Sequence, residues 1–116
     1  MALVLCTGQD PAVMETRQLI LEKSGHTVVL AKDEREIEKA CQTHPFDVVV
    51  IGQNTTPPVK ARIFRIARAI CPGTKILELH RPFSDKALPK ADAWLVMPTD
   101  APEELAKVVT SLAEAE

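Results

Sequence analysis

The stretch FDVVVIGQN, residues 46–54, sets the fold that this sequence predicts. Residues 48–51 form a four-residue apolar run, which is typical of a strand buried on both faces of a parallel sheet. The run stops at Gly52, Gln53 and Asn54. In open parallel α/β sheets, ligands and reacting groups lie where the carboxyl ends of the strands emerge. This strand therefore ends at a functional edge without an acid, a base or a nucleophile.

Strand-like and helix-like segments alternate along the rest of the chain. The first helix is marked by start and stop signals: Asp10 suits the N-cap, Pro11 the first helical position and Gly25 the end. Later helices have apolar residues at positions i, i+3, i+4 and i+7. The predicted strands are 2–6, 26–31, 46–52, 74–79 and 93–97, and the predicted helices are 10–25, 33–44, 57–71 and one that buries Leu105, Val108, Val109 and Leu112. This alternation indicates βαβ units and a parallel sheet.

The segment between the fourth and fifth strands, residues 80–92, breaks the regularity. Pro82 and Pro89 limit any helix there to about two turns, because proline interrupts the helical hydrogen-bond pattern. We therefore expect a short or irregular fourth helix. No linker or internal repeat divides the chain, so residues 1–116 are expected to form a single domain.

Composition narrows the function classes. A net charge of −2 favours neither nucleic acid nor an anionic membrane as a partner. No apolar run approaches the roughly 18 residues of a membrane span, and the start MALVLC is not a signal peptide. Three cysteines without CxxC spacing (Cys6, Cys41 and Cys71) are interpreted as reduced thiols, not as a disulfide frame or a zinc site. We expect a cytoplasmic protein.

Three stretches together resemble a response-regulator receiver (CheY-like) domain. They are the Asp10-Pro11 helix start, HPFDVVVIG at 44–52 and ADAWLVMPTDAPEEL at 91–105. Within the last, ADAWLVMP is the most specific, because it resembles the family's Ala-Asp-aromatic-Leu-Val-Lys-Pro. The resemblance covers essentially the whole chain. It implies a flavodoxin-like α/β fold with strand order 2-1-3-4-5.

Receiver domains bind Mg²⁺ through an acidic pair, accept a phosphoryl group on an aspartate, and sense it with a hydroxyl and a lysine. Carried over position by position, the acidic pair falls on Gly8 and Gln9, and the phosphoacceptor falls on Gly52. The hydroxyl falls on His80 and the lysine on Met97. The resemblance thus implies that the phosphorylation pocket is degenerate at all five positions.

A pocket of this composition lacks the chemistry of phosphotransfer. Mg²⁺ needs carboxylate oxygens, and an acyl phosphate needs a carboxylate nucleophile; only Asp10 lies nearby, and it is most simply an N-cap. We therefore expect a pseudo-receiver that is not an enzyme, with no catalytic residue, no metal and no cofactor.

The resemblance further implies a regulatory domain of two-component-type signalling that works by protein–protein contact. The expected partner is a signalling kinase, a regulator or an output domain, and a homodimer is a further option. The proline that follows the family's lysine is kept as Pro98, and Trp94 stands at the switch aromatic. We predict an interaction surface around these two residues, near the fifth strand and the last helix. For Trp94, a fixed, partly buried ring and an exposed interface anchor both stay open.

Two other functions are alternatives. A small phosphotransfer enzyme would use a Cys6 thiolate, and it requires a depressed thiol pKa. A small-ligand sensor would use the remnant pocket beneath Gly8, Gly52 and Met97, and it predicts thermal stabilisation by a metabolite.

Two groups of polar residues invite a functional interpretation. Glu78 and His80 leave the same face of the fourth strand, because residues i and i+2 share a face. This face is interpreted as exposed by the short fourth helix, and the alternative is a functional polar cluster that includes Arg81. The other group is a basic stripe on the third helix, interpreted as a solvated face or as a docking site for an acidic partner. The stripe comprises Lys60, Arg62, Arg65 and Arg68.

Overall fold

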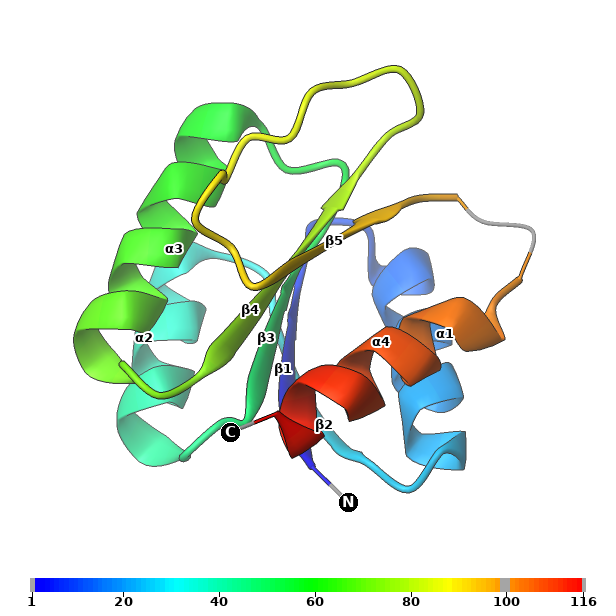
Figure 1. The fold of residues 1–116 in the computed structure, drawn as a ribbon. Helices are drawn as coiled ribbons and strands as arrows, with labels where there is room; N and C mark the ends of the chain where they lie inside the picture. Colours follow the sequence, from blue (N-terminus) through cyan, green and yellow to red (C-terminus); the bar gives the residue numbers. More distant parts are fainter. Residues whose placement is uncertain (1, 99–100, 116) are drawn as a thin grey trace.

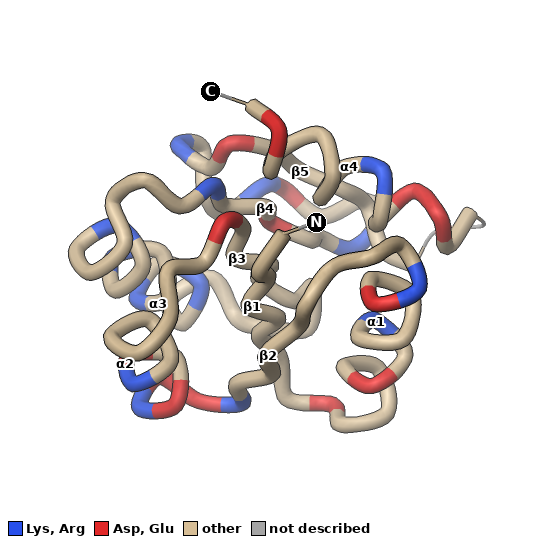
Figure 2. Tube along the Cα trace, turned by 90° about the horizontal axis from the view of Figure 1, so that it is seen from below, with Lys and Arg blue, Asp and Glu red and all other residues tan. Residues whose placement is uncertain are grey.

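The computed structural model describes residues 2–98 and 101–115, and it contains one parallel sheet between two helical layers (Figures 1 and 2). The strands are β1 (Leu3–Thr7), β2 (Thr27–Ala31), β3 (Val48–Ile51), β4 (Lys75–His80) and β5 (Ala93–Val96). The helices are α1 (Pro11–Lys23), α2 (Glu34–Thr43), α3 (Pro57–Ile70) and α4 (Glu103–Glu114). The strand order is β2-β1-β3-β4-β5 and every pairing is parallel. The predicted flavodoxin-like fold and strand order are confirmed.

The two layers form two apolar clusters, one on each face of the sheet. Helices α1 and α4 cover one face, where Leu21 and Leu105 pack against β1, β3 and β4. Helices α2 and α3 cover the other face through Ile37 and Ile63. Residues 48–51 of β3 are 0% exposed, which confirms that this strand is buried on both faces.

The helix boundaries follow the local signals in the sequence. The carboxylate of Asp10 accepts hydrogen bonds from Ala12 N at 3.0 Å and Val13 N at 3.4 Å, so it caps α1 as predicted. Gly25 ends the first helical segment with a φ of 93°, in the left-handed region that glycine enters without strain. None of the described helices combines the length and the apolar content of a membrane span.

A short or irregular fourth helix was expected between β4 and β5. The connection is irregular. Between residues 81 and 92 the structure has turns, bends and irregular segments but no helix. This loop extends beyond the carboxyl ends of the strands (Figure 1). Its tip exposes Phe83 fully, with a φ of 65°, whereas Leu88 at its base is buried against the cluster beneath α2 and α3.

Candidate functional site

The structure brings four of the five degenerate positions to one edge of the sheet. Gly8 follows β1, Gly52 follows β3, His80 ends β4 and Met97 follows β5. Met97 N donates a hydrogen bond to His80 O at 2.8 Å, and a Cβ on Gly52 would lie 3.5 Å from Gly8 Cα. Gln9 is exposed in the loop before α1.

The space around Gly52 has no room for a side chain. A Cβ built on this residue would lie 2.9 Å from Thr7 O, closer than real Cβ atoms approach a backbone oxygen. The same Cβ would lie 3.4 Å from Nη1 of Arg17. The position that resembles the phosphoacceptor therefore has neither a carboxylate nor the volume to accept one.

The residue that approaches Gly52 is Arg17, which comes from the inner face of α1 and is only 4% exposed. Its Nη2 donates a hydrogen bond to Oε1 of Gln53. Its Nε is buried without a hydrogen-bond partner, and no described carboxylate forms an ion pair with it. Burial lowers the pKa of Arg17, and the nearby Cys6 and Asp10 oppose that shift. A guanidinium nevertheless stays protonated in proteins, so the site contains a buried cation.

Arg17 is not among the site residues predicted from the sequence, although its spacing in α1 carries a signal. The buried residues of α1 are Met14, Arg17 and Leu21, at positions i, i+3 and i+7. An arginine at a core position of an amphipathic helix either snorkels to solvent or finds a function for its charge.

The residues at this edge do not fit the Mg²⁺ that receiver domains bind. Gly8, Gln9 and Gly52 supply no carboxylate, and Asp10 is engaged in capping α1. The buried Arg17 cation would repel a divalent metal. Within the described chain, no group of three His, Cys, Asp or Glu side chains could hold a metal ion.

Cys6 does not have the properties that a phosphotransfer nucleophile needs. Its side chain is 1% exposed and belongs to the cluster beneath α1 and α4. Burial raises the pKa of Cys6 to about 12, although Arg17 opposes the shift. The Cys6 alternative required a depressed pKa, so the structure contradicts that requirement.

Glu78 is fully buried, which corrects the interpretation of this face as exposed. Its Oε2 accepts hydrogen bonds at 2.8 Å from the Lys60 ammonium and from Ala87 N, and its Oε1 accepts one from Leu88 N. The Lys60 ammonium also donates to Leu79 O at 2.8 Å. Burial disfavours the charged Glu78 carboxylate, but the hydrogen bonds from Lys60, Ala87 and Leu88 and the charge of Lys60 outweigh this effect and hold the pKa of Glu78 below its ordinary value. Loop 81–92 thus closes over this face in place of a helix.

The other polar side chains near β4 do not join this network. His80 Nδ1 lies 3.3 Å from Arg81 O, and Arg81 Nε donates to Asn54 Oδ1 at 3.0 Å. The functional cluster of Glu78, His80 and Arg81 is therefore not formed. The buried partner of Glu78 is Lys60, which comes from α3.

The basic stripe predicted on α3 is not a uniform solvated face, because its members point in different directions. Lys60 is 4% exposed and belongs to the inner face with Ile63. Arg62 pairs with Glu34 of α2 at 2.9 Å. Arg68 pairs with Asp92 at 3.0 Å and packs over the Phe64 ring. Arg65 remains on the exposed side of the helix.

Trp94 and Pro98 do not lie on one continuous patch. The Trp94 indole N–H donates to Leu88 O at 2.9 Å, and the Lys86 ammonium lies 4.5 Å from the ring centroid. Of the two options for Trp94, the structure has the fixed, partly buried ring and not the exposed interface anchor. The ring packs with the cluster beneath α2 and α3. Pro98 is exposed on the other side, where it lines a groove beside α1 and α4.

This groove has a volume of about 360 Å³ and includes Met97 of the degenerate positions. A smaller hollow of about 110 Å³ is lined by Gly8 and Gln9. The predicted remnant pocket beneath Gly8, Gly52 and Met97 is only partly correct, because Met97 lines the groove but Gly8 and Gly52 do not. Arg17 and Gln53 lie at its inner end. The lining residues are Ala12, Val13, Thr16, Arg17, Ile20, Gln53, Met97, Pro98, Pro102 and Leu105.

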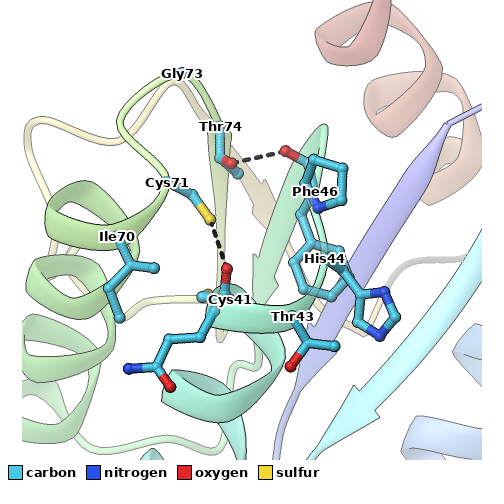
Figure 3. A pocket seen from close by; sticks show the side chains of 10 residues that line it. Cys41, Thr43, His44, Phe46, Ile70, Cys71, Gly73 and Thr74 are labelled. Carbon is cyan, nitrogen blue, oxygen red and sulfur yellow. Dashed lines mark hydrogen bonds between the residues drawn. The ribbon is translucent and has the colours of Figure 1, made fainter.

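A second hollow lies at the opposite end of the sheet, where β3 and β4 begin (Figure 3). Two of its side chains are thiols: Cys71 Sγ donates to Cys41 O at 3.4 Å. Burial raises the pKa of Cys41 to about 12, and the neighbouring Cys71 adds to the shift. The floor is closed by Thr74, whose hydroxyl donates to Phe46 O at 2.7 Å. These contacts indicate that the Cys41 and Cys71 thiols are packing groups and not activated nucleophiles.

The fold is that of CheY-like response-regulator receiver domains, which are its structural neighbours. The chemotaxis response regulator CheY4 of Vibrio cholerae is 25% identical, with a TM-score of 0.80 over 97% of this chain and 98% of that chain. A CheY-like receiver domain of Methanospirillum hungatei is 18% identical, with a TM-score of 0.85 over 98% of this chain and 94% of that chain. A structure of the histidine kinase ThkA with the response regulator TrrA holds a chain that is 21% identical, with a TM-score of 0.80 over 97% of this chain and 98% of that chain. TrrA of Thermotoga maritima is also known in complex with Mg²⁺ and BeF.

The sequence itself matches no family model and no curated protein. The similarity to solved receiver domains nevertheless confirms the resemblance at the level of the fold and of the structural neighbours.

Proposed function

We propose that this chain is a receiver-like regulatory domain that accepts no phosphoryl group and acts through contact with another protein. The observation that carries the proposal is the closure of the phosphoacceptor position. Gly52 leaves no room for a side chain, and a Cβ at this position would lie 3.4 Å from Nη1 of the buried Arg17. The same position supplies neither the nucleophile nor the metal ligands of phosphotransfer.

The partner class rests on the similarity to response regulators, one of which is solved in complex with a histidine kinase. A kinase, a regulator or an output domain of two-component signalling in the cytoplasm is the expected partner, and self-association is a further option. For the contact we favour the β5 edge, where Val96 is 42% exposed and Pro98 is exposed. Trp94 supports this edge from within, because its ring is held by Leu88.

The test is the intact mass of the protein after incubation with acetyl phosphate and Mg²⁺, with a phosphorylatable receiver domain as the positive control. We expect no added phosphoryl group under conditions that label the control. A labelled product would overturn the proposal. Its position would identify the replacement, because label on Cys6 indicates a phosphocysteine enzyme and label on Asp10 a relocated acceptor.

The contact is tested by size-exclusion chromatography with light scattering, alone and with the partner kinase of the same organism. We expect a complex or a dimer that Pro98→Asp weakens and that Gln42→Asp, on the exposed end of α2, leaves unchanged. An interaction indifferent to Pro98→Asp would move the surface away from the β5 edge.

A further inference from the structure

Two cations are buried near the carboxyl ends of the strands, and they differ in how their charge is compensated. Lys60 has the carboxylate of Glu78 at 2.8 Å, itself fully buried. Among the described residues, Arg17 has only the neutral amide oxygen of Gln53 as a hydrogen-bond acceptor, and its Nε has no partner. A buried charge without a counter-charge is costly, so proteins keep such groups where a ligand or a reaction uses them.

The groove between α1 and α4 leads to this unpaired cation. Its walls are mostly apolar, formed by Val13, Ile20 and Leu105. Its inner end is polar, because Arg17 and Gln53 meet there. A volume of about 360 Å³ lies at the small end of ligand sites, which are typically apolar with a few oriented polar groups.

Gln53 is the group that a ligand has to displace. It follows Gly52 in the loop between β3 and α3, and it is half-buried, unlike the fully enclosed Arg17. Its amide oxygen accepts one hydrogen bond from the guanidinium, where a carboxylate could accept two in parallel and add a full opposite charge. The exchange of a neutral acceptor for an anionic one is therefore favourable at this position.

We infer that the groove between α1 and α4 binds a small organic anion. The carboxylate of the ligand replaces the Gln53 amide on Arg17, and its apolar part lies between Val13, Ile20 and Leu105. Because the groove is also lined by Met97 and Pro98, a bound anion contacts the end of β5 and α1 together. The ligand would provide the input signal that phosphorylation provides in receiver domains. The inference goes beyond the proposed function and does not depend on it.

The first experiment titrates the labelled protein with benzoate and hexanoate in heteronuclear NMR, each matched to its neutral alcohol, benzyl alcohol and hexanol. We expect saturable binding of at least one anion, with a dissociation constant of about 1 mM or tighter. The perturbed amides should cluster on α1, on Gln53 and on the start of α4. The alcohols should bind at least about tenfold more weakly. No saturation by either anion, or equal binding of anion and alcohol, would overturn the inference.

Substitutions then test the charge pairing. Gln53→Glu places a carboxylate beside Arg17 from within the chain, so it should raise the melting temperature and weaken anion binding at least tenfold. Arg17→Met should also abolish anion binding. If Arg17→Met does not fold, Gln53→Glu still tests the inference. Arg65→Met removes an exposed arginine of α3 outside the groove and should change neither property. Undiminished anion binding by Gln53→Glu would contradict the inference.

Discussion

At the scale of single residues, the degenerate pocket differs from a receiver site by more than missing carboxylates. The backbone of β1 has approached Gly52 so closely that a Cβ would lie 2.9 Å from Thr7 O. Arg17 occupies the remaining space and hydrogen-bonds to Gln53. The absence of the nucleophile is therefore coupled to the packing of the neighbouring residues. We expect that an aspartate introduced at Gly52 alone does not restore a phosphorylation site.

Gly52→Asp tests this coupling. The new side chain must push Thr7 or Arg17 aside, so we expect the free energy of unfolding to fall by about 1–3 kcal/mol, as for other overpacking substitutions. We also expect no phosphorylation by acetyl phosphate, because no metal ligands are restored. Urea denaturation and intact mass measure the two results. Gly73→Asp is the matched control, since nothing lies within 4 Å of a Cβ at that position; equal stability of both variants would contradict the closure.

The buried Lys60–Glu78 pair gives a second prediction at this scale. Glu78→Gln leaves the Lys60 ammonium buried beside a neutral amide, so the free energy of unfolding should fall by about 3–5 kcal/mol. The double variant Lys60→Met/Glu78→Gln should recover part of that loss, because no uncompensated charge remains. Arg62→Met, which breaks the exposed pair with Glu34, should cost about 0–1 kcal/mol. Chemical denaturation of the four proteins measures these differences, and similar costs for the buried and exposed pairs would refute the argument.

At the scale of elements, loop 81–92 covers the face of the sheet at β4 that a helix would otherwise cover. Leu88 fills the apolar space beneath α2 and α3, and the loop N–H groups of Ala87 and Leu88 are satisfied by Glu78. The indole of Trp94 fixes Leu88 from the neighbouring strand. The base of the loop is thus ordered by burial and hydrogen bonds, while its tip presents Phe83 to solvent.

Leu88→Ala should release the base of the loop. We expect a loss of about 2–5 kcal/mol of unfolding free energy, as for other buried leucines. Trp94 is the single tryptophan, so its emission reports this site alone; it should shift to longer wavelength and become more accessible to acrylamide. Phe83→Gly is the control, because it removes an exposed ring and a left-handed φ of 65°, and it should leave Trp94 emission and stability unchanged or raise stability slightly. An unchanged Trp94 spectrum in Leu88→Ala would count against the anchoring role.

At the scale of the whole molecule, charges of both signs are spread over the helices and loops (Figure 2). Exposed charges contribute little to the free energy of unfolding. Its dependence on acidic pH is therefore expected to come mainly from a few buried groups. Glu78 is the clearest, because its pKa in the folded protein is held below the ordinary value of 4.5 despite burial. Its contribution is complete above the unfolded pKa and is lost as pH falls through the folded pKa. We therefore expect the free energy of unfolding to decline as the pH falls below the ordinary value of 4.5 and through the lower pKa of the folded state.

Urea denaturation at a series of pH values measures this dependence. The Lys60→Met/Glu78→Gln variant lacks the titrating carboxylate, so its stability should decline less steeply over the same range. An identical slope in both proteins would assign the acid sensitivity to other groups.

The sequence by itself determined the alternation of strands and helices, the parallel sheet and the capping of α1, because these follow from local chemistry and hydrophobic period. The resemblance to receiver domains implied five degenerate positions, and four of them lie at or just after strand ends in the structure. Only the tertiary structure decided what Arg17, Lys60 and Glu78 do. Each is a charged residue at a core position, and its role depends on which charge, if any, a distant segment places beside it: Glu78 for Lys60, and the neutral Gln53 for Arg17. Pairing over such separations is set by packing and not by local sequence, so spacing alone cannot reveal it.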